Sequence, residues 1–75
     1  MVISQSIINY AKQALIDELY ATAIYSKLSK YYEGKDLSRK CKEHAEIERR
    51  HAKFWMEFLM ERGVSLEGIT LGILV

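Results

Sequence analysis

Apolar residues recur every three or four positions along two long stretches of this chain. In the first stretch they run through Ile8, Ala11, Leu15 and Leu19, and are widened by Ile7, Ala14, Ala21, Ile24 and Leu28. In the second they run through Leu37, Cys41, Ala45, Ala52, Trp55, Phe58 and Leu59. This spacing has the period of an α-helix and lacks the alternation of a β-strand. The pattern therefore predicts two amphipathic helices.

The helix breakers indicate where these helices end. The chain has no proline, and its four glycines leave residues 5–33 and 35–62 free of both breakers. Gly34 can adopt the left-handed conformation that closes a helix, and Asp36 can cap the next helix. Gly63 can end the second helix in the same way as Gly34 ends the first.

These boundaries predict an all-α fold, an antiparallel helical hairpin that forms one domain over residues 1–75. We expect helices at about 5–33 and 37–62, a turn at 34–36 and a short apolar tail at 64–75. Within the tail, Ser65 can cap a short segment from Leu66 to Leu74.

A domain of 75 residues is small. Folding of so short a chain buries only about 60% of the surface that the unfolded chain exposes, so its stability is marginal. Small domains compensate with disulfides, a structural metal or a partner chain. Cys41 is the single cysteine, which excludes an internal disulfide. A metal ion, a partner chain or both are therefore expected.

Charge and hydropathy exclude several classes of function. The net charge is only +1, and the basic residues of the second helix alternate with glutamates, so nucleic acid is not an expected partner. No stretch approaches the length of a membrane span, so direct membrane insertion is not expected either. The lone thiol and the absence of a signal-peptide pattern favour a cytoplasmic location.

Ionisable side chains interrupt both apolar stripes. Glu18 lies in the first stripe, and His44, Glu48 and His51 follow one another along the second. Glu18 precedes Gly34 by 16 residues and Glu48 follows it by 14, so both lie about 21–24 Å from the turn. Glu18, Glu48 and His51 can therefore converge on one point. Two carboxylates and an imidazole suit iron or manganese, and also zinc.

The same residues lie near the middle of their helices. If two hairpins pack antiparallel about a two-fold axis perpendicular to the helices, only groups at mid-helix meet their symmetry mates. The dimer would bring together two copies of Glu18, Glu48 and His51. Four-helix bundles with two metal ions use this set: a glutamate from each of two helices and Glu-x-x-His from each of the other two.

Residues 10–25, which contain Glu18, and the Glu-x-x-His motif of residues 48–51 resemble the ferritin-like di-iron superfamily. The resemblance covers about residues 8–63. The chain is most similar to rubrerythrin-type domains, including those fused to vacuolar-iron-transporter-like membrane proteins, and to encapsulated ferritins. A Glu-x-x-His motif alone is common, and the glutamate on the apolar face of the preceding helix makes it more specific.

The resemblance implies a ferritin-like four-helix bundle formed by dimerisation. Rubrerythrins and bacterioferritins carry two such halves, whereas this chain carries one, like the encapsulated ferritins that complete their site between chains. The implied partner is a second copy, in a homodimer or higher homo-oligomer. The implied cofactor is iron, two ions per dimer, with Glu48 as the bridging ligand and Glu18 and His51 as terminal ligands.

The same resemblance implies an activity. Glu18, Glu48 and His51 would be catalytic as well as metal-binding, oxidising Fe(II) with dioxygen or peroxide in iron storage, iron handling or oxidative-stress defence. A single cysteine excludes the rubredoxin-type iron centre of full rubrerythrins, so electrons for peroxide reduction would come from elsewhere.

The residues also allow simpler interpretations. Glu18 can be a buried glutamate paired with a histidine or arginine, and Glu48 and His51 can be an ion pair on the surface. Tyr25 and His44 are level neighbours that could support the ligands through a hydrogen bond, although a core histidine is the simpler interpretation of His44. Further residues are expected to be structural or on the surface: Asp17, Tyr20, Cys41, Glu46 and Trp55.

Two alternative functions remain open. The chain could be a metal-free helical module whose apolar stripes dimerise, or an iron-delivery domain of a transporter-like protein. Zinc held by His44, Glu48 and His51 within one helix would give a purely structural site. The sequence does not decide between these functions, nor whether the chain is half of a longer protein.

Overall fold

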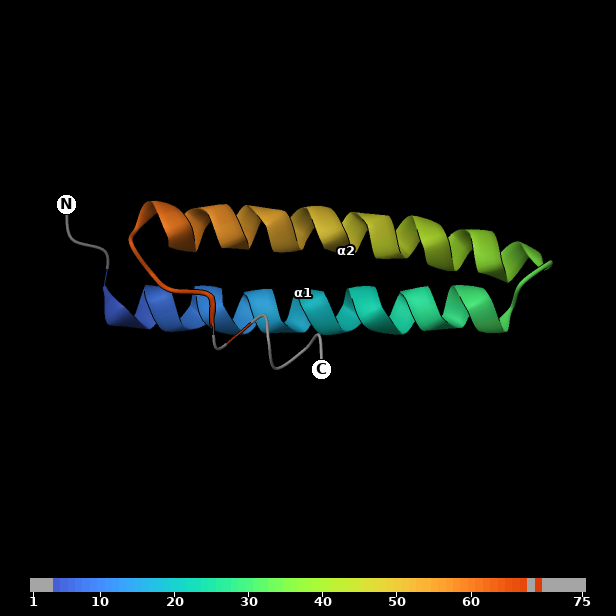
Figure 1. Cartoon of the computed structure of the whole chain (residues 1–75), viewed down its shortest axis with the longest axis horizontal. Coiled ribbons are helices and arrows are strands. Elements are labelled where there is room, and N and C mark those ends of the chain that lie inside the picture. The colour runs from blue at the N-terminus through green and yellow to red at the C-terminus, as the bar shows by residue number, and fades with distance from the viewer. Residues whose placement is uncertain (1–3, 68, 70–75) are drawn as a thin grey trace.

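The computed structural model describes residues 4–67 and 69. Helix α1 (Gln5–Tyr31) and helix α2 (Asp36–Glu61) lie side by side and antiparallel, joined by a tight turn at one end (Figure 1). The beginning of α1 and the end of α2 lie together at the other end, which we call the open end. The predicted helical hairpin is therefore confirmed. The fold is elongated, with extents of 50 × 24 × 16 Å.

Capping explains where α1 begins and ends. The side chain of Ser4 accepts a hydrogen bond from the backbone N–H of Ile7 and so satisfies one free donor of the first turn. The helix ends at Tyr31, two residues before the predicted end, because Tyr32 already departs from helical geometry. Gly34 has a φ of +86°, the conformation predicted for it, which an L-residue with a Cβ rarely adopts.

The start of α2 differs from the prediction. Lys35 and not Asp36 occupies the capping position, and the Lys35 side chain makes no capping hydrogen bond. Asp36 is the first helical residue, where its negative charge still interacts favourably with the positive end of the helix dipole.

The end of α2 is a Schellman motif. The N–H of Val64 donates to the carbonyl of Leu59, and the N–H of Gly63 donates to that of Met60, each over 3.0 Å. Gly63 has a φ of +74°, as its predicted role requires. The bounds predicted for both helices thus agree with the structure to within two residues.

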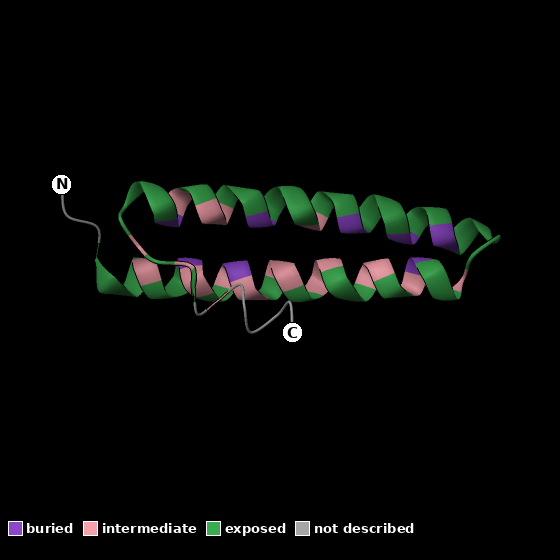
Figure 2. Ribbon diagram, in the orientation of Figure 1, coloured by how far each residue is buried: buried purple, intermediate pink, exposed green. Residues whose placement is uncertain are grey.

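The core is a narrow line between the helices. Figure 2 shows the buried residues along the facing sides of α1 and α2, while most of each helix is exposed or half-buried. The central cluster consists of Ala11, Leu15, Ala52 and Leu59. Toward the turn the line continues through Ser29, Ser38, Cys41 and Ala45, and the Ser38 hydroxyl donates to the carbonyl of Ser29 over 2.6 Å. Cys41 is a small core residue, as expected.

The segment after α2 folds back over one side of the hairpin. Val64, Leu66 and Ile69 pack against the central cluster (Figure 1). The N–H of Ile69 donates to the carbonyl of Leu66, which is the beginning of the helical segment predicted from Leu66 onwards. The rest of that prediction lies outside the described residues.

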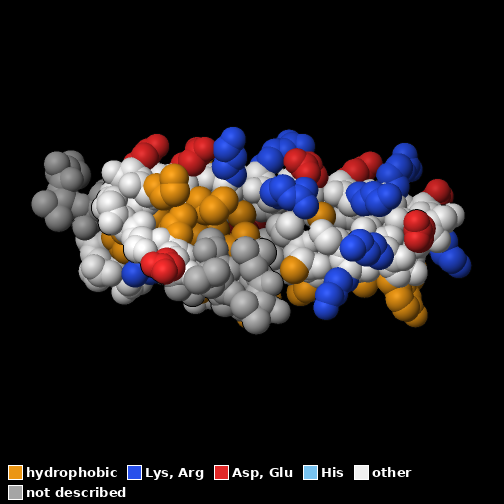
Figure 3. Space-filling model, in the orientation of Figure 1, with side chains coloured by type: hydrophobic (Ala, Val, Ile, Leu, Met, Phe, Trp, Pro, Cys, Tyr) orange, Lys and Arg blue, Asp and Glu red, His pale blue; other side chains and the backbone are white. Residues whose placement is uncertain are grey.

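Charged side chains cover the outer surface of the hairpin. Figure 3 shows Lys and Arg interleaved with Asp and Glu, and hydrophobic side chains gathered toward the open end. Ion pairs join Arg49 to Glu46 and Lys53 to Glu57 along α2. All four side chains are more than half exposed, so each pair stabilises the fold by less than about 1 kcal/mol. Neither α1 nor α2 combines the length and the apolar character that crossing a membrane requires.

Candidate metal centre

The side chains of Glu18, Glu48 and His51 converge, as predicted from their similar distances to the turn between the helices. A ligand atom from each of the three lies within 4.8 Å of the other two. The Nδ1 atom of His51 lies 3.4 Å from Oε2 of Glu18 and 3.8 Å from Oε2 of Glu48. The two carboxylates come from different helices, and the imidazole lies one turn beyond Glu48. The cluster therefore bridges α1 and α2.

The cluster lies at the centre of both helices. Residue 18 is the midpoint of α1 (Gln5–Tyr31), and the midpoint of α2 (Asp36–Glu61) falls between residues 48 and 49. Mid-helix positions are the most rigid part of a helix, because fraying is confined to its ends. The three side chains thus lie several turns away from the helix ends, where fraying occurs.

One oxygen of the cluster is buried without a partner. The Glu18 side chain is 22% exposed, and its Oε2 atom is inaccessible to solvent and accepts no hydrogen bond from the described residues. His51 Nδ1, at 3.4 Å, forms an ion pair with this oxygen when the imidazole is protonated, but the contact is not a hydrogen bond. An unpartnered buried carboxylate oxygen is costly, and a cation would compensate it.

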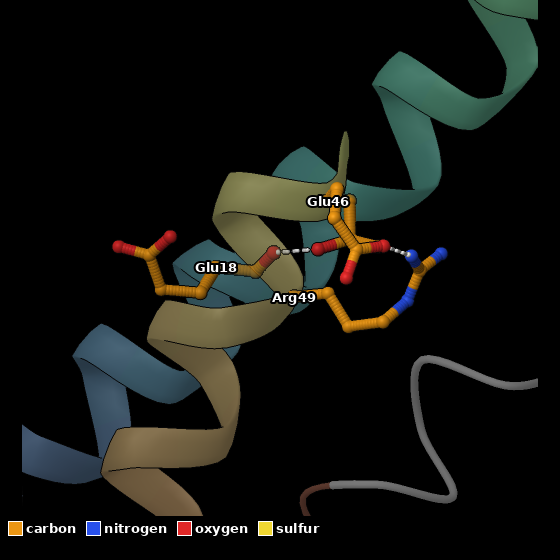
Figure 4. A network of polar contacts seen from close by, with 4 residues as sticks. Glu18, Glu46 and Arg49 are labelled. Carbon is orange, nitrogen blue, oxygen red and sulfur yellow. Dashed lines mark hydrogen bonds and ion pairs between the residues drawn. The ribbon is translucent and has the colours of Figure 1, made fainter. Parts of the chain in front are cut away.

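Figure 4 shows the neighbourhood of Glu18. The Glu18 carboxylate points away from the Glu46–Arg49 ion pair, so Arg49 does not neutralise it. The Thr22 hydroxyl donates a 2.8 Å hydrogen bond to the backbone carbonyl of Glu18, and not to its side-chain carboxylate. The partner of Glu18 is therefore the histidine and not an arginine, and the simpler interpretation of Glu18 as a glutamate paired with a histidine agrees with its contact to His51.

The three ligand candidates are not equally enclosed. The Glu48 side chain is 20% exposed, close to the value for Glu18, whereas the His51 side chain is 55% exposed. The stripe of α2 that carries His44, Glu48 and His51 is thus an open face of the single hairpin, not a buried one. The sequence predicted an apolar face there, and the single chain leaves that face uncovered.

Tyr25 and His44 are neighbours, as predicted, but they do not hydrogen-bond. Their rings stack at a centroid distance of 4.9 Å with an angle of 19° between the planes. His44 is exposed, so the expectation of a hydrogen-bonded core histidine is wrong. His44 also lies outside the group of converging ligands among the described residues, so the zinc site within α2 lacks one of its three members.

An aromatic group that includes Tyr10 and Trp55 lies next to Glu18. Tyr10 and Trp55 meet edge to face with ring centroids 5.7 Å apart, and Trp55 makes similar contacts with Phe54 and Phe58. Beside them, a surface hollow of about 270 Å³ reaches Glu18. Its lining consists of Tyr10, Gln13, Ala14, Asp17, Glu18 and Trp55. Sequence reasoning missed this hollow, although the helical spacing of Tyr10, Ala14 and Glu18 could have indicated it.

The other singled-out residues have structural surroundings. Asp17 is exposed and accepts a hydrogen bond from Gln13 over 2.9 Å, and Glu46 is exposed and paired with Arg49. Trp55 is half-buried among aromatic rings, and Tyr20 is exposed. These positions agree with the surface placement expected for Asp17 and Glu46 and with the core or interface placement expected for Trp55. Tyr20 was expected to be a core or interface aromatic, and its exposure leaves the interface role.

Comparison with known proteins identifies no relative: no family model, no curated protein and no solved structure matches this chain.

Proposed function

We propose that Glu18, Glu48 and His51 bind iron and that the protein oxidises Fe(II) at this centre. The observation that carries the proposal is the buried Oε2 of Glu18, which accepts no hydrogen bond from the described residues, with a second carboxylate and an imidazole close by. Carboxylate and imidazole ligands together suit iron and manganese, and they also accept zinc. The donor set therefore fits the metal implied by the resemblance to ferritin-like proteins.

Three ligands from one chain leave the coordination of iron incomplete. We propose that a second copy of the hairpin supplies the same three ligands from the opposite side. The exposed His51 and the half-buried Glu48 support this proposal, because the single hairpin leaves part of both side chains accessible to a partner. The dimer would be a four-helix bundle with four glutamates and two histidines around two ions, the set found in di-iron bundles.

Each side chain has a distinct task in this proposal. Glu18 and Glu48 contribute negative charge, which stabilises Fe(III) more than Fe(II) and so favours oxidation. His51 contributes a neutral donor when its Nδ1 is deprotonated, so that metal binding and proton binding compete at this atom. Iron held by Glu18, Glu48 and His51 would supply the redox chemistry, because two Fe(II) ions together can provide the two electrons that, with two protons, reduce dioxygen to hydrogen peroxide.

The test combines metal analysis with an oxidation assay. Glu48→Ala is expected to abolish both stoichiometric iron binding and the rise in Fe(III) absorbance after Fe(II) and air are mixed with the protein. Glu43→Ala is the matched control, because Glu43 is an exposed glutamate on the same helix and lies outside the cluster. A Glu48→Ala protein that still binds two metal ions per dimer would refute the assignment.

A second candidate function is a metal-free helical interaction module. The two ion pairs of His51 with Glu18 and Glu48 favour it, since a protonated imidazole could balance the carboxylates without a metal. Elemental analysis of the purified protein together with its mass in solution separates the two candidates. Metal in proportion to the chain supports the iron centre, whereas a metal-free dimer supports the interaction module.

A further inference from the structure

The hairpin exposes more surface than a compact monomer of its size. The chain exposes 5754 Å², whereas about 4,700 Å² is typical for this mass. Its radius of gyration is 14.4 Å, against about 11 Å for a compact chain of 75 residues. The excess of about 1,000 Å² is comparable to the roughly 800 Å² that each partner buries in a standard interface. A second copy is therefore an occupant of suitable size.

One side of the hairpin carries the features that such a partner would cover. Three cross-helix pairs lie on it: Tyr25 with His44, Glu18 with His51, and Tyr10 with Trp55. Glu18 and Tyr25 are seven residues apart, and His44, Glu48, His51 and Trp55 follow at helical spacing, so all three pairs share a face. We call it the open face. Aromatic side chains lie at both ends of this face, and polar side chains lie at the cluster, at His44 and in the lining of the hollow, which includes Gln13 and Asp17.

Charge is distributed unevenly along the hairpin. Residues 27–42, around the turn, carry six basic side chains and only two acidic ones. The remaining residues carry five basic and eight acidic side chains. A parallel pair would place the two basic ends together, whereas an antiparallel pair places each basic end beside the acidic remainder of the other copy. Electrostatics therefore favours the antiparallel pair.

The position of the cluster along the helices also supports antiparallel pairing. An antiparallel pair with its axis through the cluster overlaps along the full helix length only if the cluster lies at mid-helix, and it does. In such a pair, residues between the cluster and the turn of one copy lie opposite residues between the cluster and the open end of the other copy. Tyr25 lies about 10 Å from Glu18 toward the turn, and Tyr10 lies about 12 Å from it toward the open end.

Resting on the proposed function, we infer that the hollow lined by Tyr10, Ala14 and Trp55 receives the partner's Tyr25 from a second, antiparallel copy. A helical side chain leans toward the N-terminus of its helix, which moves the partner's Tyr25 toward the cluster and over the middle of the hollow. The stacked ring of the partner's His44 then meets Trp55. Each hairpin supplies one hollow and one stacked pair, so the contact occurs twice in the dimer.

The test fills the hollow without adding charge. Ala14→Leu keeps a strong helix former and occupies the space intended for the ring. Ala23→Leu is the matched control, because Ala23 is exposed on the opposite side of α1. Both changes are made in Glu48→Ala protein with a chelator present, so that dimerisation is measured without metal and with less repulsion between carboxylates. Sedimentation gives the dissociation constant, and circular dichroism checks that each variant is helical.

A distance measurement tests the direction of pairing independently. In Cys41→Ala protein, Lys35→Cys places a spin label at the turn, where the exposed Lys35 side chain makes no capping hydrogen bond. Lys35 lies 13 residues from Glu48, so two labels would be about 40 Å apart in an antiparallel dimer. In a parallel dimer the two turns would be neighbours, and the labels would be less than about 25 Å apart.

The expected result is a metal-free dimer with a label separation near 40 Å, which Ala14→Leu weakens by about tenfold or more and Ala23→Leu leaves unchanged. A monomer at all concentrations, a short label separation, or equal effects of the two leucines would overturn the docking proposal. An antiparallel dimer without iron oxidation in the unmutated chain would refute the proposed function alone. Iron oxidation together with a parallel dimer would refute the docking alone.

Discussion

Glu18→Gln is expected to change the melting temperature in opposite directions with and without metal. In the metal-free protein Oε2 of Glu18 is buried and accepts no hydrogen bond from the described residues. An amide at this position carries no charge to desolvate and has an N–H that can donate to a neighbouring carboxylate, so it avoids a cost of about 1–3 kcal/mol. The substitution also removes the ion pair with His51, but that side chain is 55% exposed, so the pair is worth less than about 1 kcal/mol. The net gain is about 1 kcal/mol, or about 4–8 °C for a domain of this size.

Metal reverses the order of the two proteins. At a free metal concentration of 100 times the dissociation constant, binding adds about 2.7 kcal/mol to the unmutated chain. If the loss of one carboxylate ligand weakens binding about 100-fold, the same concentration adds only about 0.4 kcal/mol to Glu18→Gln. The unmutated protein should therefore melt well above the variant when metal is present.

The assay is thermal unfolding followed by circular dichroism at a fixed chain concentration. Each protein is melted with a chelator and with Mn(II) or Zn(II), which avoid oxidation during the scan. Glu43→Gln is the control and should behave like the unmutated protein under both conditions. The reasoning fails if Glu18→Gln lowers the metal-free melting temperature, or if metal raises the melting temperature of both proteins equally.

Substitutions at three further positions test the packing of the hairpin around Glu18, Glu48 and His51, each by chemical denaturation. Leu15→Ala, at a side chain that is 0% exposed, should cost about 2–5 kcal/mol; a loss under 1 kcal/mol would contradict its place in the core. Ser38→Ala should cost about 1 kcal/mol through the lost bond to Ser29, whereas Ser38→Thr should retain the donor if the site tolerates a methyl group. Gly63→Ala should cost about 1 kcal/mol from its φ of +74° alone, because a Cβ there meets no atom within 4 Å; no measurable loss would refute the strain.

The fold was predictable because its determinants are local. Helical periodicity and two glycines defined both helices, and the rise per residue placed Glu18 level with Glu48 and His51. The capping position was not predictable, since Lys35 caps through its backbone geometry alone and Asp36 has the side chain that usually caps.

The surroundings of Glu18, Glu48 and His51 were less predictable, because they depend on the rotational orientation of each helix about its own axis. Periodicity places a residue on a stripe to within about a quarter of a turn, which does not separate the core line from the open face. His44 was therefore expected to be a core residue and proved to be exposed, and His51, which was placed on the same apolar stripe, is exposed as well. The stacking of Tyr25 on His44 likewise depends on side-chain rotamers that sequence spacing does not specify.

The buried line between α1 and α2 is built largely of alanine, serine and cysteine. Small side chains let the two helix axes approach closely, so the separation of the axes depends on residues that contact no ligand atom. Glu18 comes from one helix and Glu48 and His51 from the other, so the same separation determines how far apart the donors are. Zinc–oxygen distances of about 2.0–2.2 Å and calcium–oxygen distances of about 2.3–2.6 Å differ by only a few tenths of an ångström. In the proposed metal centre, a change in the volume of the side chain at position 52 is therefore expected to alter the preference among ions, at a position that leaves every donor atom unchanged.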